Sequence, residues 1–133
     1  MSETAIKSLG EIALRVNDLA AMKRFYHDVI GLAILSDSPK SVFFKVNEGF
    51  GGHTQVLVLF DRSVPVGAER TTLDHIAFTI AREDYDSELK RLTALGLKVE
   101  TTTHEWVKWR SMYVHDPEGN EIELVCYDPA IGG

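Results

Sequence analysis

The sequence lacks three features that would place a protein outside the cytoplasm or on a nucleic acid. Cys126 is the only cysteine, so no internal disulfide can form, and we expect a cytoplasmic protein. No apolar run approaches the roughly 18 residues that cross a bilayer, and residues 1–8 lack the apolar core of a signal peptide. The 14 basic residues against 20 acidic ones give a net charge of −6, which argues against nucleic acid or an anionic membrane as a partner.

The sequence does contain an internal repeat. Residues 10–16 (GEIALRV) reappear as residues 74–80 (DHIAFTI), and each copy is followed by a helical pattern that ends in Gly-Leu. A repeat of this length indicates two copies of one supersecondary unit. We predict one domain made of two modules, at about 8–61 and about 73–127, with a linker at about 61–72 that is rich in turn residues.

Each module is predicted to fold as β-α-β-β-β, which gives the fold class α+β. Asp18 is the predicted N-cap of the first helix, and Gly31 is its predicted stop. Pro117 and Gly119 predict a tight turn between the last two strands, and residues 128–133 are expected to fray. The predicted strands cover 11–16, 32–35, 42–46, 55–60, 73–80, 97–102, 109–115 and 120–126, and the predicted helices cover 19–30 and 84–95.

The first strand of each module divides its side chains between two faces, because strand residues alternate in direction. Ile12 and Leu14 would face the helix, whereas Glu11 would point to the opposite side. His75 holds the position of Glu11 in the second module. We therefore predict a curved mixed sheet around a shared cleft, with Glu11 and His75 facing into that cleft.

The repeat extends to the last strand of each module. Aligning residues 54–59 with residues 120–125 pairs Leu57 with Glu123. If the duplication is structural, the four equivalent positions hold Glu11, Leu57, His75 and Glu123. Three of these four side chains can bind a metal ion.

Motifs along nearly the whole chain carry a family resemblance, through their order and spacing rather than through any one of them. They are Ile12–Leu19 (IALRVNDL), Phe25–Tyr26, Ile30–Leu32, Asp74–Phe78 (DHIAF) and Asp116–Leu124 (DPEGNEIEL). On these motifs the chain resembles the vicinal oxygen chelate superfamily of glyoxalases, bleomycin resistance proteins and extradiol dioxygenases. The resemblance also implies a homodimer, and long edge strands need covering in any case.

The resemblance implies a divalent metal site. His75 and Glu123 match the family's ligands, and Glu11 stands where His or Gln is more usual. Leu57 stands at the fourth ligand position of glyoxalase I and cannot coordinate, so three protein ligands and open positions are expected. Such a set suits Mn, Fe, Ni, Zn or Mg. Glu11 and Glu123 are the candidate catalytic residues, since a carboxylate released from the metal can move a proton.

These expectations predict a glyoxalase-like, metal-dependent enzyme of the lyase or isomerase type. It would act on a small oxygen-rich metabolite or xenobiotic that chelates the metal through two adjacent oxygens. The alternatives are a metal-free ligand-binding protein, similar to the bleomycin resistance proteins, and an Fe-dependent extradiol-type dioxygenase. The candidate substrate-binding residues are Gln55, Leu57, Trp106, Trp109, Arg110 and Tyr113.

Some of these residues have simpler interpretations. His75 could be a core histidine that donates to a backbone carbonyl, or it could pair with Glu11 in a salt bridge without metal. The two tryptophans, Trp106 and Trp109, could cap the cleft over an aromatic or anionic ligand. They could equally pack an edge of the sheet or a subunit contact.

Overall fold

The computed structural model describes residues 7–62, 73 and 75–132, which form two compact units divided after residue 66. The predicted linker lies outside the described residues from position 63 to 72, and so does Asp74. None of the described helices is long and apolar enough to cross a membrane.

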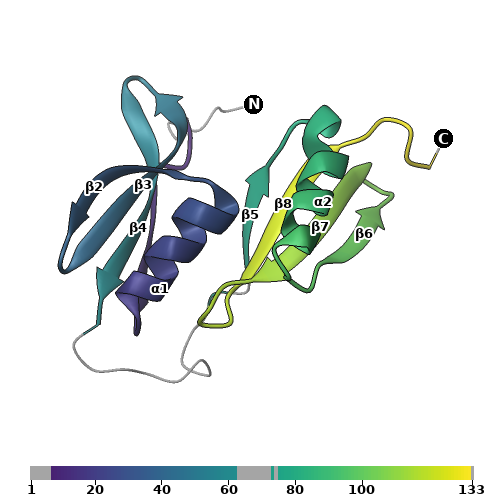
Figure 1. Cartoon of the computed structure of the whole chain (residues 1–133). Coiled ribbons are helices and arrows are strands. Elements are labelled where there is room, and N and C mark those ends of the chain that lie inside the picture. The colour runs from purple at the N-terminus through teal and green to yellow at the C-terminus, as the bar shows by residue number, and fades with distance from the viewer. Residues whose placement is uncertain (1–6, 63–72, 74, 133) are drawn as a thin grey trace. The chain divides into compact units, whose positions relative to one another are not determined.

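The first unit contains a four-stranded sheet and one helical segment (Figure 1). The strand order is β1-β4-β3-β2, with β1 parallel to β4 and the other neighbours antiparallel. Its elements are β1 (Glu11–Val16), α1 (Leu19–Arg24), the π-helical segment η1 (Phe25–Ile30), β2 (Ala33–Ser38), β3 (Ser41–Phe50) and β4 (His53–Asp61).

The helical segment starts and stops where the sequence predicted. The Asp18 carboxylate accepts a hydrogen bond from the Ala21 N–H at 3.0 Å, as an N-cap does. Gly31 ends the segment in the left-handed region, at φ 95°, where a side chain would be strained. The second half is π-helical rather than α-helical, and the Gly31 N–H reaches back five residues to the Tyr26 carbonyl. The Leu32 N–H donates to the same carbonyl and closes the end of the segment.

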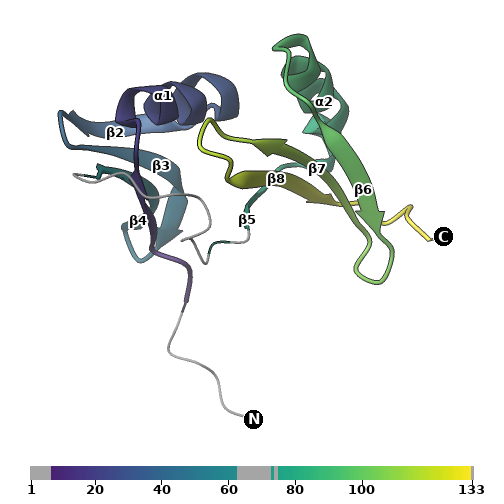
Figure 2. The same cartoon turned by 90° about the horizontal axis from the view of Figure 1, so that it is seen from below.

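The helical segment lies across one face of the first sheet (Figure 2). Met22 and Tyr26 pack there with Phe44, Leu57 and Leu59, and all five are essentially inaccessible to solvent. This buried set is the core of the first unit, because apolar area removed from water is the main stabilising contribution to folding.

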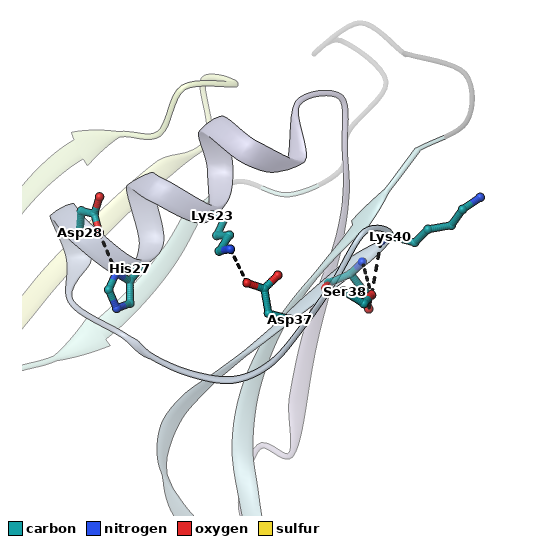
Figure 3. Close-up of polar contacts among 7 residues, drawn as sticks. Lys23, His27, Asp28, Asp37, Ser38 and Lys40 are labelled. Carbon is teal, nitrogen blue, oxygen red and sulfur yellow. Dashed lines mark hydrogen bonds and ion pairs between the residues drawn. The ribbon is translucent and has the colours of Figure 1, made fainter.

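A surface ion pair also attaches the helical segment to the edge strand. Lys23 on α1 pairs with Asp37 on β2, while His27 pairs with its neighbour Asp28 (Figure 3). The Ser38 hydroxyl accepts from the Lys40 N–H and so closes the β2–β3 turn. Exposed pairs of this kind contribute only up to about 1 kcal/mol each, so the apolar core determines the position of the helix.

The second unit repeats this arrangement. Its sheet has the order β5-β8-β7-β6, with β5 parallel to β8 and the remaining neighbours antiparallel. Its elements are β5 (His75–Thr79), the 3₁₀ turn η3 (Arg82–Asp84), α2 (Tyr85–Ala94), β6 (Glu100–His104), β7 (Trp109–His115) and β8 (Glu121–Tyr127). The predicted α+β class with two β-α-β-β-β modules is therefore confirmed.

The turn between β7 and β8 forms as predicted. The Gly119 N–H donates to the Asp116 carbonyl at 3.0 Å, which closes a four-residue turn. One Asp116 carboxylate oxygen accepts from the Glu118 and Asn120 N–H groups, and the other accepts from the Asn120 side-chain amide. These bonds explain how Asp116 is buried at 4% exposure without an unsatisfied charge.

Several predicted boundaries were wrong, and so was the expected fraying of the last residues. β2 runs to Ser38 rather than ending at residue 35. β3 and β4 run on to a two-residue Gly51-Gly52 turn, where Phe50 pairs with His53, instead of ending in a longer loop. β6 begins at Glu100 rather than at residue 97. The C-terminal residues 128–132 are not frayed, since Asp128 and Ile131 are both buried.

Candidate metal centre

The strand register of the second unit determines which side chains share a face. His75 pairs with Glu121, Ala77 with Glu123, and Glu123 with Tyr113, and paired residues point the same way. The intervening residues, such as Ile122 and Met112, face α2 and are buried. We call the other side the Glu123 face; it carries His75, Ala77, Ser111, Tyr113 and Glu123.

Two of the predicted metal ligands meet on the Glu123 face. His75 Nε2 lies 3.1 Å from Glu123 Oε1, with the His75 side chain 37% exposed and the Glu123 side chain 8% exposed. The second oxygen of the same carboxylate, Oε2, accepts a hydrogen bond from Ser111 Oγ at 2.6 Å. The structure thus brings His75 and Glu123 together, and it assigns each Glu123 oxygen a different partner.

Tyr113 stands beside this pair. It is the cross-strand partner of Glu123, and its hydroxyl lies 3.1 Å from His104 Nε2. Burial raises the pKa of the Tyr113 phenol, and the negative charge of Glu123 raises it further. Tyr113 is therefore a neutral phenol at physiological pH, and it can donate a hydrogen bond.

In the first unit, the register corrects the predicted equivalence of Leu57 and Glu123. Glu11 pairs with Val56, Ile12 with Leu57 and Ala13 with Val58, so Leu57 lies on the helix side and is 1% exposed. Because Ala77 pairs with Glu123 in the second unit and Ala13 corresponds to Ala77, the true counterpart of Glu123 is Val58. The expectation that Leu57 faces the site with Glu11 was wrong.

Gln55 is affected by the same correction. Along β4 it shares the face of Leu57, whereas Val56 and Val58 share the face of Glu11. Gln55 is partly buried and pairs with Asn47, next to an irregularity in β3. It therefore points away from the side of the sheet that carries Glu11.

Arg110 also lies on the side opposite to the one expected. It follows Trp109 on β7, so it points to the helix side, where its guanidinium lies over the Tyr85 ring at 5.7 Å from the centroid. Both Arg110 Nε and Arg110 Nη2 donate to Asp128 Oδ2, which also accepts from Arg82 Nε. Arg110 holds the C-terminal segment in place and does not reach the Glu123 face.

The two tryptophans differ in position. Trp106 is in the turn between β6 and β7 and is 86% exposed, so it is not on either sheet face. Trp109 is 44% exposed and alternates onto the same face as Ser111 and Tyr113. Of Trp106, Trp109 and Arg110, Trp109 is therefore the one that shares a face with Glu123, and its cross-strand partner His104 lies on the same face.

Within residues 7–62, 73 and 75–132, no group of three His, Cys, Asp or Glu side chains is close enough to hold a metal ion. Taken by itself, the second unit offers the two-residue donor set of His75 and Glu123. Its chemistry fits a divalent cation, since imidazole nitrogen and carboxylate oxygen are ordinary ligands for Mn, Fe, Ni or Zn. Glu11 belongs to the first unit, where it opens β1.

Sequence reasoning missed Ser111, which donates to Glu123. It grouped His104 with the nearby tryptophans and basic residues but did not count it among the site residues. The signal for Ser111 was present, because residues 109, 111 and 113 alternate onto one face of a strand that pairs with the strand of Glu123. The signal for His104 was weaker. Its contact with Tyr113 depends on the pairing of β6 with β7 across a turn that the sequence does not specify.

The fold and the His75–Glu123 pair describe one class of protein, in which two β-α-β-β-β modules carry a candidate metal site. Comparison with known family models gives a family of this class. The family model of the Glyoxalase/Bleomycin resistance protein/Dioxygenase superfamily matches residues 8–124. The match covers most of the chain, so the protein belongs to this family. Membership alone leaves the reaction open, because one fold can host many chemistries.

Several relatives are similar over nearly the whole chain. The metallothiol transferase FosB of Staphylococcus saprophyticus is 25% identical over 120 residues, which cover 90% of this chain and 76% of the relative. The crystal structure of lactoylglutathione lyase from Agrobacterium tumefaciens is 30% identical, with a TM-score of 0.68 over 92% of this chain and 96% of that one. A FosX variant from Listeria monocytogenes, crystallised with Mn(II) and 1S,2S-dihydroxypropylphosphonic acid, is 25% identical, with a TM-score of 0.69 over 93% of both chains.

Proposed function

We propose that this protein is a metal-dependent enzyme that acts on a small oxygen-rich metabolite or xenobiotic bound to the metal through two adjacent oxygens. The observation that carries the proposal is the 3.1 Å approach of His75 Nε2 to Glu123 Oε1 on one sheet face. A buried carboxylate next to an imidazole needs a cation, a proton or another donor to be stable. Ser111 supplies a donor to Glu123 Oε2, and a divalent metal ion held by Glu123 Oε1 and His75 would supply the cation for the other oxygen.

We infer Glu11 as the third protein ligand. It lies on the face of the first sheet that corresponds to the Glu123 face, since Glu11 and His75 hold the same position relative to the paired strands β4 and β8. Val58, the counterpart of Glu123 in the first unit, cannot coordinate. The proposed set is therefore His75, Glu123 and Glu11, with positions left open for a substrate.

The relatives support this choice of chemistry. One is named a metallothiol transferase, and another was crystallised with Mn(II) and a phosphonic acid that carries two neighbouring hydroxyl groups. Among metal-dependent enzymes, we propose a reaction of the lyase or isomerase type. Because Val58 removes the fourth ligand of glyoxalase I, we expect weak or no activity toward a thiol hemithioacetal.

The bound metal ion would supply Lewis acidity, which stabilises negative charge on a substrate oxygen. The chain's own residues would do the rest. Ser111 holds Glu123 Oε2, Tyr113 offers a neutral hydroxyl that can donate to a substrate oxygen, and Trp109 covers the same face. Glu11 is the group that we assign to move a proton, since it is a carboxylate exposed to solvent.

The test is elemental analysis of protein purified without chelator and without a nickel column. We expect near-stoichiometric Mn, Fe, Ni or Zn in the wild type and in the control His27→Ala, which removes an exposed histidine on η1. Loss of a residue that hydrogen-bonds to a metal ligand lowers metal affinity about 10- to 100-fold. His75→Ala removes a proposed ligand itself, so we expect a larger fall in metal affinity. Equal metal content in His75→Ala and the wild type would contradict the assignment.

A metal-free binding protein is the second candidate, because His75 and Glu123 also suit an ion pair when the imidazole is protonated. It is supported if the wild type binds no metal at any added concentration while its circular dichroism shows an intact fold. The homodimer, the cytoplasmic location and the absence of nucleic-acid and membrane partners stay predictions from the sequence.

A further inference from the structure

We propose that Ser111 is a positioning residue that holds one oxygen of Glu123 and so limits this carboxylate to a single oxygen as metal ligand. This inference rests on the function proposed above, and it adds a specificity device to that site. A carboxylate can bind a cation through one oxygen or through both. Which mode it adopts decides how many positions remain for a substrate.

The geometry gives the two oxygens of Glu123 separate partners. Ser111 Oγ donates to Oε2 at 2.6 Å, a short distance for an O–H···O hydrogen bond. Oε1 is the oxygen next to His75 Nε2, at 3.1 Å. Ser111 is fully buried and Glu123 nearly so, and a hydrogen bond between buried groups is not weakened by competing water.

Ser111 itself has little freedom to move. It lies within β7, between Thr102 of β6 and Val125 of β8, so its backbone is held from both sides. From α2, the Tyr85 hydroxyl donates to the Ser111 carbonyl at 2.9 Å, and this bond is buried. A hydroxyl carried on such a backbone can hold the carboxylate in one orientation.

The consequence concerns the open positions on the metal. With Oε2 engaged by Ser111, Glu123 would offer Oε1 alone to a bound metal ion, which would leave a further position for substrate. A substrate that chelates through two adjacent oxygens needs two such positions. Ser111 therefore favours bidentate substrates over those that offer one oxygen, without touching the substrate itself.

The test uses Co(II) as the added metal, because its visible absorption reports the coordination number and geometry of the site. In Ser111→Ala, Oε2 is free to join the metal, so we expect a different spectrum with weaker absorption per bound Co(II). We also expect a loss in Co(II) affinity of about 10- to 100-fold, as is usual when a partner of a metal ligand is removed. Ser111→Thr keeps the hydroxyl and should restore the wild-type spectrum.

Thr102→Ala is the matched control, since it removes an exposed hydroxyl from the neighbouring strand at the residue that pairs with Ser111. It should leave both spectrum and affinity unchanged. If Ser111→Ala does not fold, the near-isosteric Ser111→Cys, which has only a weak donor, replaces it with the same expected result.

The outcomes separate this inference from the proposed function. A wild type that binds no Co(II) overturns the proposed metal site and the role of Ser111 with it. A wild type that binds Co(II), together with a Ser111→Ala protein of identical spectrum and affinity, overturns only the positioning role. A changed spectrum that Ser111→Thr fails to restore also counts against it, because the change would then come from packing and not from the hydroxyl.

Discussion

The hydrogen bond from Tyr85 to Ser111 offers a direct measure of what holds α2 against its sheet. Tyr85 is 4% exposed, and its hydroxyl donates to the Ser111 carbonyl at 2.9 Å in a buried position. Tyr85→Phe keeps the ring against Arg110 and removes only the donor. A buried carbonyl that loses a partner costs about 1–3 kcal/mol. Since 1 kcal/mol corresponds to about 4 °C in Tm for a domain near this size, we expect Tm to fall by several degrees.

The same tyrosine should make the stability of the wild type sensitive to alkaline pH. Burial raises the pKa of Tyr85, although the nearby Arg110 charge opposes the shift. The unfolded chain ionises its tyrosines near pH 10. The contribution of Tyr85 to stability is thus complete below that pH, and it is lost as pH rises through the higher folded pKa. Tyr85→Phe should lose less stability over this range than the wild type.

Urea denaturation followed by circular dichroism, at neutral pH and then at increasing alkaline pH, measures both effects. Tyr127→Phe is the matched control, because Tyr127 is 57% exposed and should change neither the urea midpoint nor its pH dependence. The other buried ionisable groups are present in all three proteins, so their contributions cancel in the comparison. A Tyr85→Phe protein as stable as Tyr127→Phe at neutral pH would refute the reasoning.

Two further outcomes concern buried groups of the second unit. A backbone hydrogen bond from Ala130, with support from Arg110 and Arg82, lowers the pKa of Asp128. The stabilising effect of the Asp128 carboxylate is therefore lost as pH falls below the unfolded pKa of about 3.9. In urea titrations, Asp128→Asn should have a lower midpoint than the wild type at neutral pH, and its midpoint should fall less steeply toward acid pH. Cys126 is 1% exposed, and burial raises the pKa of its thiol. A colorimetric thiol reagent should therefore react with Cys126 only as the protein unfolds. Rapid reaction with the native protein would contradict the structure.

The sequence predicted most of the fold because its local signals agree with one another. The Asp18 cap, the Gly31 stop and the Asp116–Gly119 turn are short-range features, and all three form as expected. The repeat then predicted the second module from the first. The boundary errors fall where hydrogen bonding continues beyond the apolar residues, as in β3 and β4, which extend to a tight turn through polar and glycine positions.

The register of β4 could not be read from its sequence. Residues 56–60 (VLVLF) are apolar without interruption, so the alternation that distinguishes two faces is missing. A shift of one residue moves every side chain to the other face. The alignment with residues 120–125 was off by one position for this reason, and only the pairing of Ile12 with Leu57 reveals that Val58 is the counterpart of Glu123.

Arg110 shows a different error, because the information was present in the sequence and was not used. Trp109 and Arg110 are neighbours on a strand, so they point to opposite faces and cannot both line one site. The partner of Arg110 is Asp128, in a segment that was expected to fray. That contact depends on the chain end folding back against β7, which no local signal indicates.

Ser111 also allows the metal hypothesis to be tested by stability alone, without spectroscopy. A ligand that binds only the folded state stabilises it by about 2.7 kcal/mol at a concentration of 100 times its dissociation constant. If Ser111→Ala weakens binding by about 10- to 100-fold, the same relation leaves about 0.4–1.4 kcal/mol at that metal concentration. The Mn(II)-dependent rise in Tm should therefore shrink in Ser111→Ala and stay full in Thr102→Ala. Equal shifts in the two variants would mean that the hydroxyl on Glu123 Oε2 has no part in metal binding.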